Sequence, residues 1–195
     1  MLHRSVLSNK VSKLKTAVRA VLGFNSAPLL YNKTMVIYLG TDHRGFKLKE
    51  HIKKALTERG YPIMDLGNTV YDESDDYPDF AKKVAEKISL DFDRSRGIVM
   101  CGSGVGVDIV ANKFPHVRSA LVGTPDQAFD SRTDDNTNIL SLGANYLEPE
   151  EAEKIILTWL QTPFSEDNRH KSRLKKIEQI ESLVLNREHE SGIEQ

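Results

Sequence analysis

Short apolar runs alternate with amphipathic helical stretches from Met35 onward, and this order limits the possible folds more than any other feature of the chain. The strand candidates are 35–40, 61–66, 96–101, 117–123 and 138–143. Helical spacing occurs at 46–59, 79–89, 105–113, 125–134, 149–161 and 170–186. Strands separated by helices predict a parallel sheet with helices on both faces. We therefore expect an α/β fold, a Rossmann-like three-layer sandwich with a five-stranded parallel sheet and a long C-terminal helix.

Several of the predicted helices carry local signals of their own. Pro78 and Pro125 fall in first turns, where the missing N–H of proline is tolerated, and Thr124 is a candidate N-cap. The last helix places apolar residues along one face, at Leu174, Ile177, Ile180 and Leu183 or Val184. Such a stripe packs either on a partner subunit or on the helix's own domain, and we leave both alternatives open.

Composition narrows the class of partner. The 195 residues, of which 39% are hydrophobic and 28% charged, suit a single domain. A net charge of −1 provides no strong field toward nucleic acid or a membrane surface. The single cysteine, Cys101, permits no internal disulfide and no cysteine pair that binds metal. We expect a cytoplasmic protein that acts on a small molecule, without nucleic acid, membrane or metal.

The two ends of the chain differ from its middle. The first acidic residue is Asp42, whereas basic residues recur before it, and apolar residues there follow a helical period. This pattern suits an organelle transit peptide or, in the alternative we favour, an extension outside the fold. We divide the chain into a basic N-terminal extension at 1–34, a folded domain at 35–187 and a polar tail at 188–195.

Polar residues and glycines follow two of the predicted strands. The first strand leads into Asp42 and His43, and the third leads into the glycine-rich turn at 101–106. Ligands of open parallel sheets bind beyond the carboxyl ends of the strands, and such a turn directs N–H groups at an anion. A thiol among N–H groups, beside Ser103, favours the thiolate, which can act as a base. The alternative for Cys101 is a small buried residue at a strand end.

Three familiar glycine-rich motifs do not fit this turn. A dinucleotide fingerprint needs its third glycine where Val107 stands, and it belongs to the first strand–helix unit. A cysteine phosphatase loop needs an arginine at that same position. A Walker loop needs a terminal Gly-Lys-Ser/Thr, which is missing here.

Several motifs stand together in order along the chain. They are Thr41-Asp42-His43-Arg44-Gly45, Asp76-Tyr77-Pro78, Cys101-Gly102-Ser103-Gly104-Val105-Gly106, Ala111-Asn112-Lys113-Phe114 and Asn136-Thr137-Asn138. With them the chain resembles the ribose 5-phosphate isomerase B and galactose 6-phosphate isomerase family from about Met35 to Ile180. The resemblance implies a cofactor-free aldose–ketose isomerase that works through a cis-enediolate. Its leading reaction converts ribose 5-phosphate to ribulose 5-phosphate, in carbohydrate metabolism.

The resemblance also implies roles for residues at the turn and after the first strand. Cys101 matches the base that removes the proton beside the sugar carbonyl. Ser103 and the backbone N–H groups of Gly102, Gly104 and Gly106 match the loop that stabilises the negative oxygen. Asp42 matches a carboxylate that binds sugar hydroxyls, with capping of the next helix as its alternative role.

Phosphate recognition is implied at several further positions. His43, Arg169 and Arg173 match phosphate-binding residues, and Arg118 matches an arginine contributed by the neighbouring subunit. The implied assembly is a homodimer or a dimer of dimers with the site at the interface. Tyr77 is expected at the rim of the site or in the core. We expect His116 and His170 at the surface.

One position departs from the family pattern. The family reads Ser-Arg-x-His-Asn-Asp-Thr-Asn, and its histidine is held to open the sugar ring, whereas residues 131–138 place Asp134 there, followed by Asp135. Aspartate is ordinarily ionised at neutral pH and is then a poor proton donor. Either Asp134 takes over ring opening with the help of burial or of Asp135, or the substrate opens unaided, or ring opening is slow.

Three alternatives to a pentose phosphate isomerase remain open from the sequence. The first is an isomerase of a six-carbon sugar phosphate. The second is a sugar-phosphate-binding protein that has lost turnover at Asp134. The third is a thiol hydrolase, which is disfavoured because no histidine is evidently placed to activate Cys101.

Overall fold

The structure is a computed structural model that describes residues 35–190, with side chains described as far as 186. The predicted extension at 1–34 lies outside the described residues, as does the predicted tail from 191 onward. The division of the chain at 35 and 187 therefore stays a prediction.

Five strands form one parallel sheet in the order β2-β1-β3-β5-β4. Their bounds are β1 Ile37–Thr41, β2 Ile63–Asp65, β3 Arg96–Cys101, β4 Ser119–Leu121 and β5 Ile139–Gly143. β1 pairs with β3 from Ile37↔Arg96 to Thr41↔Met100, and β3 pairs with β5 from Gly97↔Ile139 to Cys101↔Gly143. The prediction of a five-stranded parallel sheet is confirmed.

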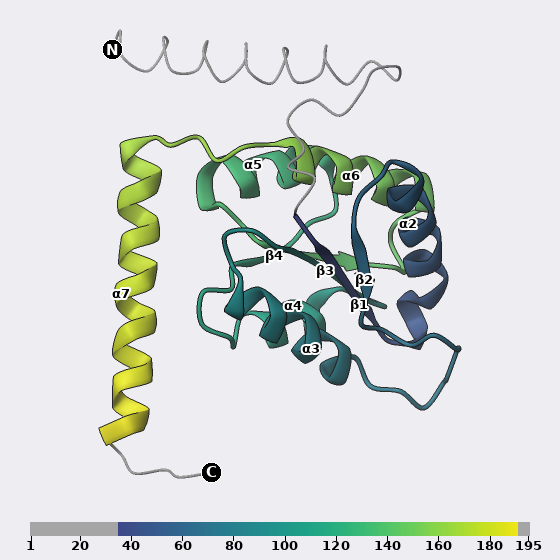
Figure 1. Ribbon diagram of the computed structural model, residues 1–195, viewed down its shortest axis with the longest axis horizontal. Coiled ribbons are helices and arrows are strands. Elements are labelled where there is room, and N and C mark those ends of the chain that lie inside the picture. The colour runs from purple at the N-terminus through teal and green to yellow at the C-terminus, as the bar shows by residue number, and fades with distance from the viewer. Residues whose placement is uncertain (1–34, 191–195) are drawn as a thin grey trace, which may run out of the picture. The chain divides into compact units, whose positions relative to one another are not determined.

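Helices cover both faces of this sheet, as predicted for a three-layer sandwich (Figure 1). α3 and α4 lie on one face, and α2, α5 and α6 lie on the other. The bounds are α2 Phe46–Glu58, α3 Tyr77–Leu90, α4 Val105–Ala111, α5 Pro125–Asp135, α6 Pro149–Gln161 and α7 Asn168–Glu190, with a short 3-10 helix, η1, at His43–Gly45. No helix within residues 35–190 is long and apolar enough to cross a membrane.

Burial explains why these segments form the layers. β5 is buried at every position and β3 at every position after Arg96, as expected for central strands covered on both faces. The predicted caps are also confirmed. The Thr124 hydroxyl accepts a hydrogen bond from the Gln127 N–H at 3.2 Å, and Pro125 begins α5.

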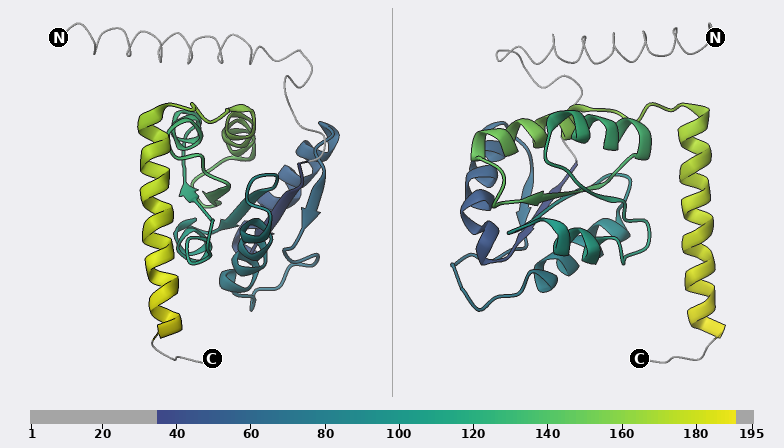
Figure 2. Two further views of the ribbon diagram at one scale, coloured as in Figure 1. Left: turned by 60° about the vertical axis from the view of Figure 1, so that its left-hand side comes forward. Right: turned by 180° about the vertical axis from the view of Figure 1, so that it is seen from behind.

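α7 differs from the other helices because much of its apolar stripe is uncovered. Ile177, Ile180 and Leu183 are 45%, 62% and 61% exposed. Figure 2 shows α7 alongside the layers rather than within them. It is tied to the domain partly by Glu181, whose carboxylate accepts a hydrogen bond from the His116 N–H at 2.8 Å. Packing against its own domain therefore covers only part of the apolar stripe of α7.

Candidate active site

The strand order predicts one ligand crevice, between the carboxyl ends of β1 and β3. β2 pairs with one edge of β1, and β3 pairs with the other edge. The direction in which successive strands are added therefore reverses between β1 and β3. Ligands of open α/β sheets bind at such a reversal. Asp42 and His43 follow β1 directly, and β3 ends at Cys101. The predicted base and two predicted substrate-binding residues therefore meet at this crevice.

The glycine-rich turn is held in place by the end of β5. Gly104 has a φ of +78°, and a Cβ there would lie 2.8 Å from the Gly143 nitrogen. The Ala144 N–H donates to the Cys101 carbonyl and the Asn145 N–H to the Gly102 carbonyl, both at 2.9 Å. A side chain at Gly104 would force the turn away from β5, and the two backbone hydrogen bonds hold the turn against the end of that strand.

Cys101 is 4% exposed, and its sulfur accepts a hydrogen bond from the Gly104 N–H at 3.2 Å. Cys101 is therefore buried at a strand end, as the alternative interpretation of this residue predicted. The N–H directed at the sulfur also stabilises negative charge there, as a base requires.

Four further predicted residues lie in or against the same turn. Ser103 is exposed, and its hydroxyl accepts a hydrogen bond from the Val105 N–H at 3.3 Å. A Cβ at Gly106 would lie 2.5 Å from the Tyr77 ring, so Tyr77 packs directly on the turn. A Cβ at Gly102 would lie 2.6 Å from Arg44 Nε. Arg44 therefore places a positive charge over the turn, a role that the sequence analysis missed.

Asp42 caps η1 and still keeps one oxygen for a ligand. Its Oδ1 accepts hydrogen bonds from the Arg44 and Gly45 N–H groups at 3.0 and 3.2 Å, and none of the described residues bonds to Oδ2. Burial raises the pKa of Asp42, and the two backbone N–H groups oppose that rise. Capping and sugar binding, which the sequence presented as alternatives, are compatible because they use different oxygens.

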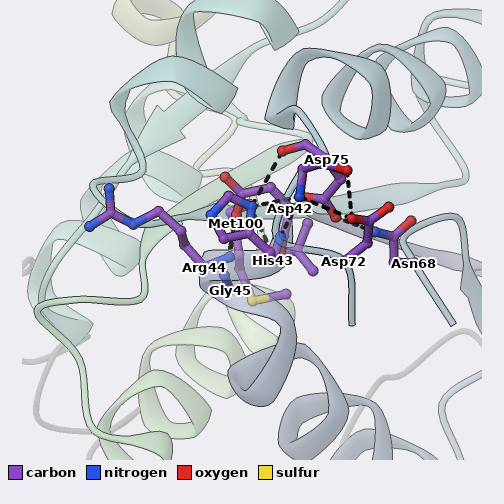
Figure 3. Close-up of polar contacts among 10 residues, drawn as sticks. Asp42, His43, Arg44, Gly45, Asn68, Asp72, Asp75 and Met100 are labelled. Carbon is purple, nitrogen blue, oxygen red and sulfur yellow. Dashed lines mark hydrogen bonds and ion pairs between the residues drawn. The ribbon is translucent and has the colours of Figure 1, made fainter. Parts of the chain in front are cut away.

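His43 lies at the start of η1 and is held by Asp75, a residue that the sequence analysis did not select (Figure 3). Its Nδ1 lies 2.8 Å from Asp75 Oδ1, and Asn68 bonds to the other carboxylate oxygen. The hydrogen bond to Asp75 raises the pKa of His43, against the effect of desolvation. The sequence shows an acidic stretch before α3, which includes Asp75. It does not show that this stretch contacts His43 in the fold.

The other predicted site residues lie at the amino end of the sheet. Arg118 directly precedes β4, and Asp134 and Asp135 end α5 just before β5. Arg169 and Arg173 lie in the first turns of α7, which is held against the end of α5 by the Ser165 N–H donating to the Thr133 carbonyl at 3.2 Å. The five strand residues of β5 separate these two ends by roughly 15 Å.

Arginine side chains gather at this amino end, with acidic side chains from several elements close to Arg118. Burial lowers the pKa of Arg132 to about 9, and the nearby charges of Arg96 and Arg118 act in the same direction. Arg118 donates from Nε to the Asn136 carbonyl at 3.1 Å. Arg169 and Arg173 are exposed, and their guanidinium groups bond to none of the described residues.

Asp134 has a histidine neighbour from α7. Its Oδ1 accepts a hydrogen bond from the Thr133 hydroxyl at 3.0 Å and lies 3.7 Å from His170 Nδ1. The His170 side chain is 19% exposed, so it lies at the surface as predicted but is partly covered. Its Nδ1 also bonds to Ser165 Oγ and the Thr133 carbonyl, at 2.8 and 3.2 Å.

A groove of about 540 Å³ opens on the β4–β5 side of the glycine turn. It is lined by Ser103, Val105, Leu121, Val122, Gly123, Gln127, Gly143, Tyr146 and Leu147. Val105, Leu121 and Tyr146 are exposed apolar or aromatic residues, so this surface is largely apolar. Within the described part of the chain, no group of three or more His, Cys, Asp or Glu residues is placed to hold a metal ion.

Comparison with known proteins gives the class. Residues 37–177 match the model of the Ribose/Galactose Isomerase family. This match covers most of the chain and includes the crevice, the glycine turn and the start of α7. The chain belongs to the Ribose/Galactose Isomerase family.

Its relatives narrow the comparison further. The chain is 40% identical to a probable ribose-5-phosphate isomerase B of Mycoplasma genitalium over 141 residues, 72% of this chain and 92% of the relative. It is 39% identical to ribose-5-phosphate isomerase B of Escherichia coli over 145 residues, 74% and 95% of the two chains.

Solved structures agree with this assignment. The crystal structure of the Mycoplasma genitalium enzyme with bound ribulose-5-phosphate aligns with a TM-score of 0.74 at 38% identity, covering 76% of this chain and 97% of that one. Type B ribose 5-phosphate isomerase of Trypanosoma cruzi aligns with a TM-score of 0.73 at 38% identity, covering 77% and 99%.

Proposed function

We propose that this protein is an aldose–ketose isomerase that interconverts ribose 5-phosphate and ribulose 5-phosphate. The observation that carries the proposal is the Cys101 sulfur, which lies at the carboxyl end of β3 with the Gly104 N–H directed at it and Asp42 across the crevice. The relatives named above are isomerases of this substrate. The predicted site residues support the proposal by their positions, and their roles remain proposals.

The reaction needs one base and a stabilised oxygen. The Cys101 thiolate removes the proton from carbon 2 of the open-chain aldose. The electrons of that C–H bond form a double bond between carbons 1 and 2, and the carbonyl oxygen becomes the enediolate oxygen. N–H groups of the rigid turn stabilise this charge, which in enzymes is commonly a large contribution to catalysis. The proton then returns to carbon 1, while the hydroxyl proton of carbon 2 moves to the oxygen of carbon 1.

Each step is a proton transfer to or from the sugar with no net oxidation or reduction of it, so the proposed mechanism uses no metal and no organic cofactor. Asp42 Oδ2 is placed to accept a hydrogen bond from a sugar hydroxyl at the crevice. Ser103 stands at the exposed side of the same turn. The proposed isomerase domain is 35–187, acting in the cytoplasm.

A second copy of the chain would complete the site. Arg118, Asp134, Asp135, Arg169 and Arg173 lie at the opposite end of the sheet from Cys101, farther away than one pentose phosphate can reach. If they bind the substrate of Cys101, they bind the substrate held by a partner subunit. The uncovered stripe of α7 and the apolar groove beside Ser103 support such contacts. The proposed assembly is a homodimer, or a dimer of such dimers, in which the partner contributes Arg118 and its neighbours.

Ring opening is assigned to Asp134 in this proposal. Asp134 replaces the histidine of the family pattern, and the His170 imidazole lies 3.7 Å away. The Asp134 carboxylate accepts the proton of the hydroxyl on carbon 1. The carbonyl forms as the bond from carbon 1 to the ring oxygen breaks, and the same proton is then returned to that oxygen, which becomes a free hydroxyl.

Proton exchange followed by NMR tests the function. The protein is incubated in heavy water with ribose 5-phosphate and, separately, with ribulose 5-phosphate and with six-carbon sugar phosphates. We expect deuterium at carbon 2 of the aldose together with conversion to the ketose, both lost in Cys101→Ala. Substrate binding without exchange in either protein would favour the sugar-phosphate-binding alternative, and release of phosphate would favour the hydrolase.

A further inference from the structure

Asp75 is held on both carboxylate oxygens beside the crevice (Figure 3). Its Oδ1 accepts hydrogen bonds from the His43 backbone N–H at 2.7 Å and contacts His43 Nδ1 at 2.8 Å. Asn68 donates to Oδ2. The Asp75 side chain is 7% exposed, compared with 27% for His43. A nearly buried carboxylate fixed in this way holds the more open imidazole in one orientation.

The contacts of Nδ1 decide which nitrogen of His43 is available to a ligand. Nδ1 faces the Asp75 carboxylate at 2.8 Å and the Asp75 backbone carbonyl at 3.3 Å, and both groups only accept hydrogen bonds. Nδ1 therefore carries a proton. Nε2, on the far side of the ring, bonds to none of the described residues, so it is the atom left for a ligand.

The charges around His43 favour the imidazolium, in which Nε2 also carries a proton. The hydrogen bond to Asp75 raises the pKa of His43 and Asp42 acts in the same direction, whereas desolvation opposes them. Asp72 also faces His43, and the ring of Tyr71 meets its edge with centroids 6.3 Å apart. Arg44 points away from this cluster (Figure 3). In the imidazolium form that these charges favour, Nε2 is a charged N–H donor.

We propose that Asp75 is a positioning residue for phosphate recognition, holding His43 by Nδ1 so that Nε2–H is presented to the phosphate group of the sugar phosphate. The inference rests on the proposed function for the identity of the substrate. It adds a residue that acts through His43 and has no contact with the substrate itself. A charged N–H donor makes stronger hydrogen bonds to phosphate than a neutral one does.

The test uses the full chain with Asp75→Asn, which removes the charge and keeps an oxygen able to accept the His43 hydrogen bonds. Asp72→Asn is the matched control, because Asp72 also faces His43 but bonds to Ser74. The two readouts are the NMR titration of the His43 imidazole and calorimetric binding of inorganic phosphate and ribose 5-phosphate. Neither readout requires turnover.

We expect Asp75→Asn to lower the pH at which His43 titrates and to weaken phosphate binding about tenfold where only the wild-type imidazole is charged, a loss typical of a charged hydrogen bond. At lower pH, where both proteins carry the imidazolium, the difference should shrink. In turnover, KM should rise in the same pH range while kcat stays within about twofold, since Asp75 acts on binding. Asp72→Asn should alter phosphate binding far less.

Two results would overturn the proposal. One is an unchanged His43 titration in Asp75→Asn. The other is a shifted titration with unchanged phosphate affinity, which would leave Asp75 a purely structural residue. If the wild-type protein binds phosphate through His43, and Asp75→Asn weakens that binding, but the protein isomerises no sugar, the proposed function fails while the role of Asp75 stands.

Discussion

The two ends of the sheet are built in opposite ways. At the carboxyl end, Cys101 and Gly104 are buried, and the turn that carries them is bonded to the end of β5. At the amino end, Arg169 and Arg173 are exposed and their guanidinium groups bond to none of the described residues. The turn at the carboxyl end is held by contacts within one chain, whereas Arg169 and Arg173 at the amino end present charge that is free for a ligand.

This difference separates two tasks of an isomerase. Holding a base and an oxyanion site requires fixed geometry, which a buried and hydrogen-bonded turn provides. Binding a phosphate requires charged groups that can reach a ligand, which exposed arginines provide. In the proposed assembly, the fixed end of one copy meets the charged end of another.

Replacing Cys101 gives the largest expected effect and tests the chemical role of the carboxyl end. Cys101→Ala should lower kcat about 1000-fold, as expected when a general base is lost. Stability should change little because the side chain is small. A variant that folds and retains more than a tenth of the wild-type rate would show that another group is the base.

Two alanine substitutions separate the tight packing of the glycine turn from the cost of placing a side chain at a positive φ. Gly104→Ala should lower the free energy of unfolding by about 3 kcal/mol, because it adds a clash with the backbone at Gly143 to the cost of a positive φ. Gly60→Ala is the control, since Gly60 has a φ of +84° but open space around it, and should cost about 1 kcal/mol. Urea unfolding measures both. Equal losses of unfolding free energy in the two variants would mean that the turn moves to accommodate the added methyl group.

Removing charge from the amino end should affect binding rather than chemistry. Arg173→Ala should raise KM about tenfold, the loss of one charged hydrogen bond, with kcat nearly unchanged. Lys175→Ala, on the same helix but a different face, provides the control and should leave KM unchanged. Steady-state kinetics with ribulose 5-phosphate measure both. Equal effects would point to the general field of α7 rather than to a phosphate contact.

The smallest expected effect concerns ring opening. Asp134→His restores the histidine of the family pattern and should raise kcat/KM for ribose 5-phosphate a few-fold, well below the full range of acid–base catalysis. Deuterium exchange into open-chain ribulose 5-phosphate, which needs no ring opening, should change less. A loss of activity with the aldose would show that Asp134 and His170 already work as a pair.

The sequence predicted most of the fold because local signals agreed with the final packing. Apolar runs placed β3 and β5 correctly, and Thr124 caps α5 as expected. Strand order was not readable, since it depends on contacts between distant segments. The opposite positions of Cys101 and Asp134 were readable, since one ends the predicted strand 96–101 and the other precedes the predicted strand 138–143 of a parallel sheet, but the sequence analysis did not draw this consequence.

The residues around His43 were missed for a similar reason. Asp75 is 32 positions from His43 in sequence, and nothing in the acidic stretch at 72–76 distinguishes it from its neighbours. The periodicity of α7 likewise predicted an apolar face without showing what covers it. In each case, the missing information is a contact between distant segments, which no local sequence pattern predicts.

Mixed dimers test most directly the claim that the two ends act together across copies. Cys101→Ala and Arg169→Ala/Arg173→Ala chains with different affinity tags are co-expressed and purified through both tags. The assay uses a substrate concentration below the wild-type KM, where the raised KM leaves the arginine variant nearly inactive. One of the two sites in each mixed dimer should be intact, so about half of the wild-type activity should return, as two-fold symmetry requires. Cys101→Ala combined with Asp42→Ala, both at the carboxyl end, should stay inactive. Equal activity in the two mixtures, or a protein that forms no dimer, would contradict the account.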